Sequence, residues 1–102
     1  MDFMPSEFED ITKLENVYIG ERSIMSIASA STGWFSPDSS LDVTLPNVTG
    51  YTRVGAICIP DTAQFVGITP YNRSGTKWSC NFYCRNAITD KHIYFYPIYL
   101  KN

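Results

Sequence analysis

The sequence predicts an all-β protein, an antiparallel β-sandwich of jelly-roll-like form with a short N-terminal helix. From Ile19 onward, short apolar stretches alternate with turn residues, a pattern typical of sandwiches and barrels. With 102 residues, 44% of them hydrophobic, the chain can build one core but not two. We therefore expect a helical or extended segment at 1–18 and one β-sandwich domain at 19–102, with about seven or eight strands.

The N-terminal segment carries the helical pattern. Ser6 can cap a helix, Glu9 follows three residues later as in a capping box, and apolar residues recur at helical spacing at Phe8, Ile11 and Leu14. A helix this short is stable only when its apolar stripe is packed. We expect it over residues 6–18, packed on the β domain or on copies of itself in neighbouring chains.

The clearest strand is predicted at residues 77–85. Trp78, Cys80, Phe82 and Cys84 alternate there with polar residues, so one register places all four in the core. Further strands are expected at 23–28, 41–45, 53–59, 65–69 and 92–100, with a hairpin connection at 72–75.

The last strand is apolar on both of its faces. Tyr94, Tyr96, Ile98 and Leu100 lie on one face, and Ile93, Phe95, Pro97 and Tyr99 lie on the other. A small sandwich has one interior, so something must cover the second face. Pro97 lacks a ladder donor, which predicts an edge strand or a bulge at that point.

A second chain is the economical cover for this face. We expect a homotrimer, or another symmetric oligomer, whose interface includes Phe8, Ile11, Leu14, Tyr94, Tyr96 and Ile98. The competing arrangement is a monomer in which the N-terminal helix folds back over the last strand.

Charge and composition argue against several classes of function. The net charge of -2 and the pI near 5.1 give no basic patch for nucleic acid, and no stretch approaches the roughly 20 apolar residues of a membrane span. His92 is the one histidine and has no recognisable catalytic context, so we expect an ordinary strand residue there. No enzyme activity and no cofactor are expected.

The cysteines are Cys58, Cys80 and Cys84. Cys80 and Cys84 lie about 13 Å apart along one strand, too far to bond to each other. Cys58 could pair with either if their strands are neighbours, but three small buried hydrophobic residues are the simpler expectation. Zinc would need a fourth ligand, so no metal site is predicted.

Aromatic residues make up 15% of the chain. Tyrosine and tryptophan pair an apolar ring with a polar tip, which suits protein interfaces and the stacking of sugar rings. Trp34, next to Gly33 and a turn, is either a core plug or an exposed platform. We take Trp34, Tyr71 and Tyr83 as candidate ligand-binding residues.

The order of several motifs resembles a known class of module. A Gly-Tyr-Thr-Arg-Val-Gly strand at 50–55 is followed by Phe-Val-Gly-Ile at 65–68, a Ser-Gly-Thr-Lys-Trp turn at 74–78, a strand end at Cys84-Arg85-Asn86 and an aromatic last strand. This resembles C-terminal modules of tail-fibre, baseplate and receptor-binding proteins of phages and prophages of Gram-positive bacteria.

The resemblance implies a trimeric sandwich in the virion, made in the bacterial cytoplasm, that binds a host-surface saccharide and contacts other tail or capsid proteins. It assigns no binding residue. Two alternatives stay open: a structural head-decoration or fibre-anchoring protein without a glycan site, and a free carbohydrate-binding module attached to a hydrolase.

Overall fold

The computed structural model describes residues 16–36 and 41–102 and contains two antiparallel sheets. The strands are β1 (Val17–Ile19), β2 (Ser23–Ala30), β3 (Gly33–Phe35), β4 (Val43–Thr44), β5 (Tyr51–Pro60), β6 (Phe65–Ser74), β7 (Lys77–Cys84) and β8 (Ile88–Lys101). The expectation of an all-β chain is confirmed for these residues.

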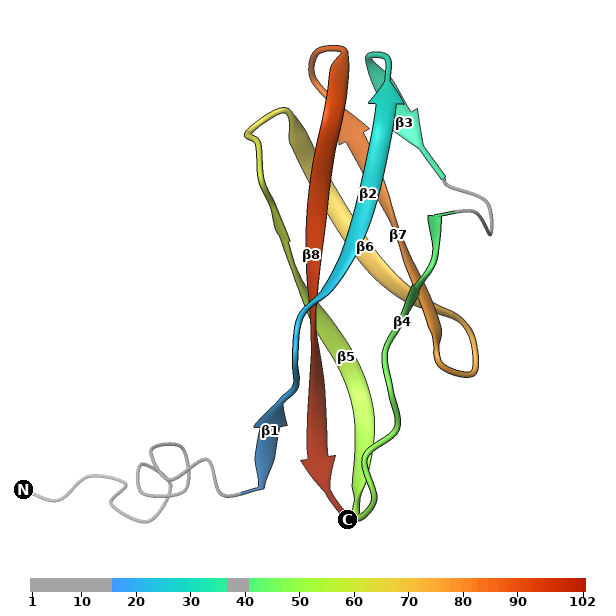
Figure 1. Ribbon diagram of the computed structural model, residues 1–102, viewed down its shortest axis with the longest axis vertical. Helices are drawn as coiled ribbons and strands as arrows, with labels where there is room; N and C mark the ends of the chain where they lie inside the picture. Colours follow the sequence, from blue (N-terminus) through green and yellow to red (C-terminus); the bar gives the residue numbers. More distant parts are fainter. Residues whose placement is uncertain (1–15, 37–40) are drawn as a thin grey trace, which may run out of the picture.

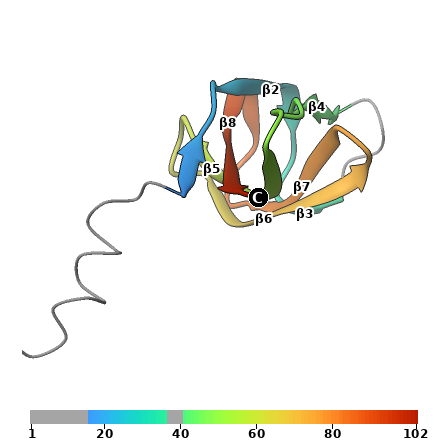
Figure 2. The same ribbon diagram turned by 90° about the horizontal axis from the view of Figure 1, so that it is seen from below.

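Both sheets are built on the same plan. In sheet A the central strand β8 pairs with β5 on one side and with β1 and β2 in succession on the other. In sheet B the central strand β7 pairs with β6 on one side and with β3 and β4 on the other. Figure 1 shows β8 running along the length of the molecule with β7 lying obliquely to one side of it, and Figure 2, which looks along the sandwich, shows the two sheets as opposite layers.

The core lies between the two central strands. Trp78, Cys80, Phe82 and Cys84 of β7 are buried, so the predicted register of this strand is confirmed. Phe82 stacks on Phe35 at 5.3 Å between ring centroids. From sheet A the buried side chains Met25, Ile27, Ile93, Phe95, Pro97 and Tyr99 point toward them.

One outward residue of β7 differs from the expectation of an alternating buried and exposed strand. Ser79 is fully buried, and its hydroxyl donates to the Leu41 carbonyl at 3.3 Å. The segment that leads into β4 therefore covers the outer surface of β7 at this point. The serine satisfies a backbone acceptor there, so its burial does not require a shift of register.

The predicted edge position of the last strand is wrong, because β8 is the centre of sheet A. On one side of β8, the neighbouring strands β1 and β2 are separated by a break between Ile19 and Ser23, and this break lies beside Pro97. The Gly20 amide donates to the Pro97 carbonyl at 2.9 Å, so the side of Pro97 that lacks an N–H faces this break. A Cβ on Gly20 would lie 2.9 Å from the Pro97 ring, so glycine permits the approach. The bulge lies in β5, where the register shifts between Arg53 and Gly55.

The expected N-terminal helix receives no support. Residues 1–15, including Phe8, Ile11 and Leu14, lie outside the described residues. The last residues of the expected helix, Val17 and Tyr18, belong to β1 and pair with Leu100 and Tyr99 of β8. Pairing with the edge of β8 satisfies the backbone hydrogen-bonding groups of these residues. This pairing outweighs their weak helical propensity.

Arg53 joins the two sheets at one end of the sandwich. Its guanidinium donates to the carbonyls of Leu45 and Gly75 at 2.8 and 2.9 Å and to Asn47 Oδ1 at 2.9 Å, and it lies 5.8 Å from the Trp78 ring. These partners belong to the loops on both sides of β7. The side chain therefore fixes sheet A to sheet B.

Candidate assembly and ligand surfaces

The outer face of sheet A is apolar. Side chains alternate across a strand, so the residues between the buried ones of β8 point away from the core. Register places Ile57 and Ile59 of β5 beside Tyr96 and Tyr94, and Ile24 of β2 on the other side of Tyr94. We call the following set the apolar face: Val17, Ile19, Ile24, Val54, Ile57, Ile59, Tyr94, Tyr96, Ile98 and Leu100.

The apolar face is large for a protein of this size. Its seven aliphatic side chains other than Ile98 are each between 37% and 52% exposed. At about 80 Å² for each of these side chains, and with the partly covered tyrosine rings, the face leaves about 600 Å² of apolar surface in water. That area is at the upper end of what monomeric soluble proteins expose.

Charged groups gather around Tyr94 of this face. The Arg22 guanidinium lies 4.8 Å from the centre of the Tyr94 ring, and the His92 ring stacks at 6.2 Å between centroids. His92 Nδ1 is 3.0 Å from Asp61 Oδ2. Burial opposes ionisation of Asp61, but the hydrogen bonds and charge of His92, with the charge of Lys91, outweigh it and lower the pKa of the carboxyl.

The predicted interface residues of the last strand do share one face. Tyr94, Tyr96 and Ile98 are half-buried and point outward, whereas their neighbours in sequence fill the core. Sequence reasoning missed the rest of the apolar face, which β1, β2 and β5 supply. The sequence of β5 indicated this face, because its larger residues Ile57 and Ile59 alternate with the smaller Ala56 and Cys58. In the structure the larger pair points outward and the smaller pair points inward.

The outer face of sheet B is different and carries an exposed tryptophan. Trp34 is 70% exposed and pairs in register with Tyr83 of β7. The two rings meet edge to face, with centroids 5.2 Å apart and planes at 72°. Of the two readings of Trp34, the exposed platform is therefore the one the structure has.

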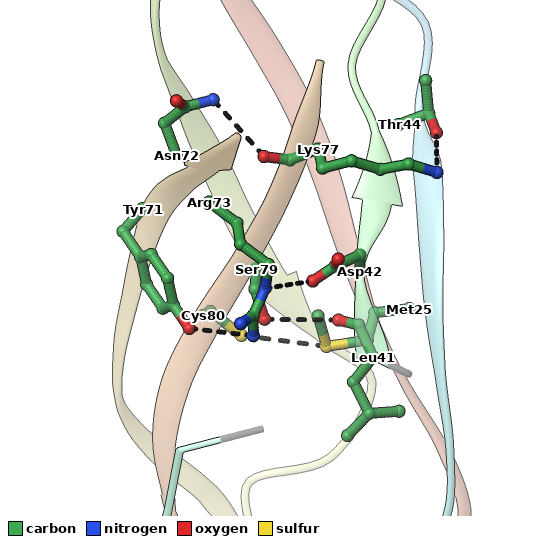
Figure 3. Close-up of polar contacts among 10 residues, drawn as sticks. All are labelled: Met25, Leu41, Asp42, Thr44, Tyr71, Asn72, Arg73, Lys77, Ser79 and Cys80. Carbon is green, nitrogen blue, oxygen red and sulfur yellow. Dashed lines mark hydrogen bonds and ion pairs between the residues drawn. The ribbon is translucent and has the colours of Figure 1, made fainter. Parts of the chain in front are cut away.

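Tyr71 lies on the same face, farther along β7. It pairs with Ser79, four residues from Tyr83, which corresponds to about 13 Å along the strand. Arg73 donates to the Tyr71 hydroxyl at 3.1 Å and pairs with Asp42, as Figure 3 shows. The structure thus brings Trp34 and Tyr83 into contact and places Tyr71 apart from them, with an oriented ring.

All three cysteines are free thiols. Burial raises the pKa of the Cys58 and Cys80 thiols to about 12, and for Cys80 the nearby Cys58 adds to the effect. Burial also raises the pKa of Cys84. Cys80 Sγ contacts Met25 Sδ at 3.9 Å within the core. These thiols pack as small hydrophobic groups.

Comparison of the chain with known protein families, with curated proteins and with solved structures gives no significant match. Within 16–36 and 41–102 no cluster of three or more His, Cys, Asp or Glu side chains has a geometry that could hold a metal ion. The same residues contain no helix that could cross a membrane.

Proposed function

We propose that this chain is a non-catalytic virion module of the phage or prophage tail-fibre or baseplate type, which forms a symmetric homo-oligomer through its apolar face. The opposite sheet then contacts a host-surface saccharide. The observation that carries the proposal is that strongly exposed aliphatic side chains gather on the outer side of sheet A, whereas none of those described in residues 16–36 and 41–102 lies on the outer side of sheet B.

The size of the apolar face suits contact between copies. Two such faces would remove about 1,200 Å² from water, which reaches the range of stable, specific protein interfaces. The charged groups described at this face, Arg22 and the Asp61–His92 pair, gather around Tyr94, and the other side chains of the face are aliphatic or tyrosine, so association would desolvate few charges. A contact surface with few charged groups is typical of the centre of subunit interfaces.

The strand arrangement supports the proposed class. The pairing of β2 with β8 is nested around the pairing of β3 with β7, as in a jelly-roll-like connection of two sheets. Closed symmetry is the common form of homo-oligomers, and in a closed ring of three each copy would contact its two neighbours through different parts of the apolar face. We propose the homotrimer that the sequence resemblance implies.

Molar mass in solution tests the assembly. Light scattering at micromolar concentration should give the intact chain a mass three times its 11.6 kDa. Ile57→Lys, at the centre of the apolar face, should give a monomer that remains folded. Thr69→Lys is the matched control, because Thr69 is exposed on the outer side of sheet B and its replacement should leave the oligomer intact. A monomeric mass for the unaltered chain would refute the proposal.

Two other classes make different predictions. A head-decoration or fibre-anchoring protein would also assemble but would bind no saccharide. A free carbohydrate-binding module would bind saccharide as a monomer. The mass measurement and the binding experiment described next separate these three classes.

A further inference from the structure

Trp34 is exposed and yet held in position. The six-membered ring of its indole lies against Gly67, where a Cβ would come within 2.9 Å of Trp34 Cη2. Gly67 has a φ of 62°, in the left-handed region, at a register irregularity of β6. Tyr83 of the adjacent strand β7 also contacts the indole, edge to face. The rest of the indole surface is exposed to solvent. The ring is therefore held in position although it does not pack in the core.

The polar groups beside Trp34 follow a regular order along sheet B. One step along β7 from the Trp34 and Tyr83 pair, Asn81 lies opposite Thr69, and one step farther Tyr71 lies opposite Ser79. Asn81 Oδ1 is buried and has no hydrogen-bond partner among the residues that the structure describes, whereas other atoms of Asn81 are exposed. Thr69 and the exposed part of Asn81 therefore present polar groups beside the Trp34 and Tyr83 pair.

We propose that Trp34, Asn81 and Tyr71 form the binding row for a linear oligosaccharide. The inference deepens the proposed function, on which it rests, by naming the site. A sugar ring has one face rich in C–H groups, which can stack on the Trp34 indole, and hydroxyl groups at its edge, which can bond to Thr69 and to the exposed part of the Asn81 side chain. The distance of about 13 Å from Tyr83 to Tyr71 along β7 corresponds to a few linked sugar rings.

The composition of the row favours a saccharide over a protein partner. Trp34 is the one large apolar residue of this face that is strongly exposed within the described chain, and its neighbours Thr69 and Asn81 are polar. A protein interface needs a broad apolar centre, which sheet A offers and sheet B does not. Tyr71 is fixed by Arg73 and Asp42, so its ring is oriented before any ligand arrives.

Calorimetry and fluorescence together test the row. The probes are maltotriose, triacetylchitotriose and purified polysaccharide from a Gram-positive cell wall. We expect at least one to bind the intact chain, and Trp34→Ala to weaken that binding about tenfold, a loss typical of a central contact residue. Tyr71→Ala should weaken it several-fold. Ile57→Lys, on the opposite sheet, should leave the affinity per chain unchanged.

The two tryptophans locate the ligand without any substitution. Trp34 is 70% exposed and Trp78 is 8% exposed, so acrylamide should quench mainly Trp34 and a bound sugar should protect it. Binding of none of the probes, or binding that Trp34→Ala leaves unchanged, would overturn the proposal. Either result would leave the oligomeric mass unaffected, so it would not be mistaken for a failure of assembly.

Discussion

Sheet A and sheet B have the same plan but opposite outer surfaces. β7 alternates buried apolar residues with outward Lys77, Asn81 and Tyr83, as expected for a sheet that faces solvent on one side. β8 alternates buried residues with outward Tyr96, Ile98 and Leu100. One central strand is therefore patterned to face water, and the other presents an apolar outer surface.

The largest effect on stability is expected where the two sheets meet. Phe82→Ala should lower the free energy of unfolding by about 3 to 5 kcal/mol, because the ring is fully buried between Phe35 and Phe65. Tyr83→Ala, one residue along and on the outer face, should cost about 1 kcal/mol, the size of one aromatic pair. Urea unfolding of both variants measures the difference, and equal losses would contradict the assignment of inner and outer faces.

A smaller effect should follow from loosening the link between the sheets. Arg53→Lys keeps the charge, but a lysine lacks the guanidinium that donates to the Leu45 and Gly75 carbonyls at the same time. We therefore expect the free energy of unfolding to fall by about 1 to 3 kcal/mol. If the two faces belong to one cooperative unit, thermal unfolding should stay a single transition at lower temperature. Arg22→Lys, at the rim of sheet A, is the control and should change little. A loss no larger than that of the control would remove Arg53 from this role.

The smallest expected effect is on the stability of the protein at low pH. The pKa of Asp61 is lowered in the folded protein, so its ionised form contributes stability at higher pH, and this contribution is lost as the pH falls through the folded-state pKa. Between pH 5 and pH 3, on either side of the ordinary value of about 3.8, Asp61→Asn should show a weaker decline in melting temperature than the unaltered chain. Parallel declines would show that the pair with His92 adds no pH dependence beside the apolar face.

Much of the fold could be predicted from local patterns. The register of β7 followed from strict alternation, and the two-sided pattern of residues 93–100 correctly indicated a strand with an apolar second face. The position of Pro97 could not be predicted, because it depends on the interruption of the neighbouring strand at Gly20. That interruption arises from long-range pairing, which no short window of sequence reveals.

The candidate sites were only partly visible in the sequence. Trp34 was recognisable as a platform or a plug, and the choice between them depended on Gly67 of β6, which lies far from it in sequence. The apolar face combines four strands, of which the pattern of one was noticed. Ser79 was expected on an exposed surface, but the Leu41 segment covers it, and only the folded chain brings the two together.

The central place of β8 has a consequence for how the protein folds during synthesis. β1, β2 and β5 all take their ladder partners from β8, and Val17 meets Leu100 about 80 positions later. Until residues 88–101 leave the ribosome, three strands of sheet A have no mate, and their apolar side chains stay open to neighbouring nascent chains. Sheet A can therefore form only late in synthesis, when its middle strand β8 pairs with β1, β2 and β5.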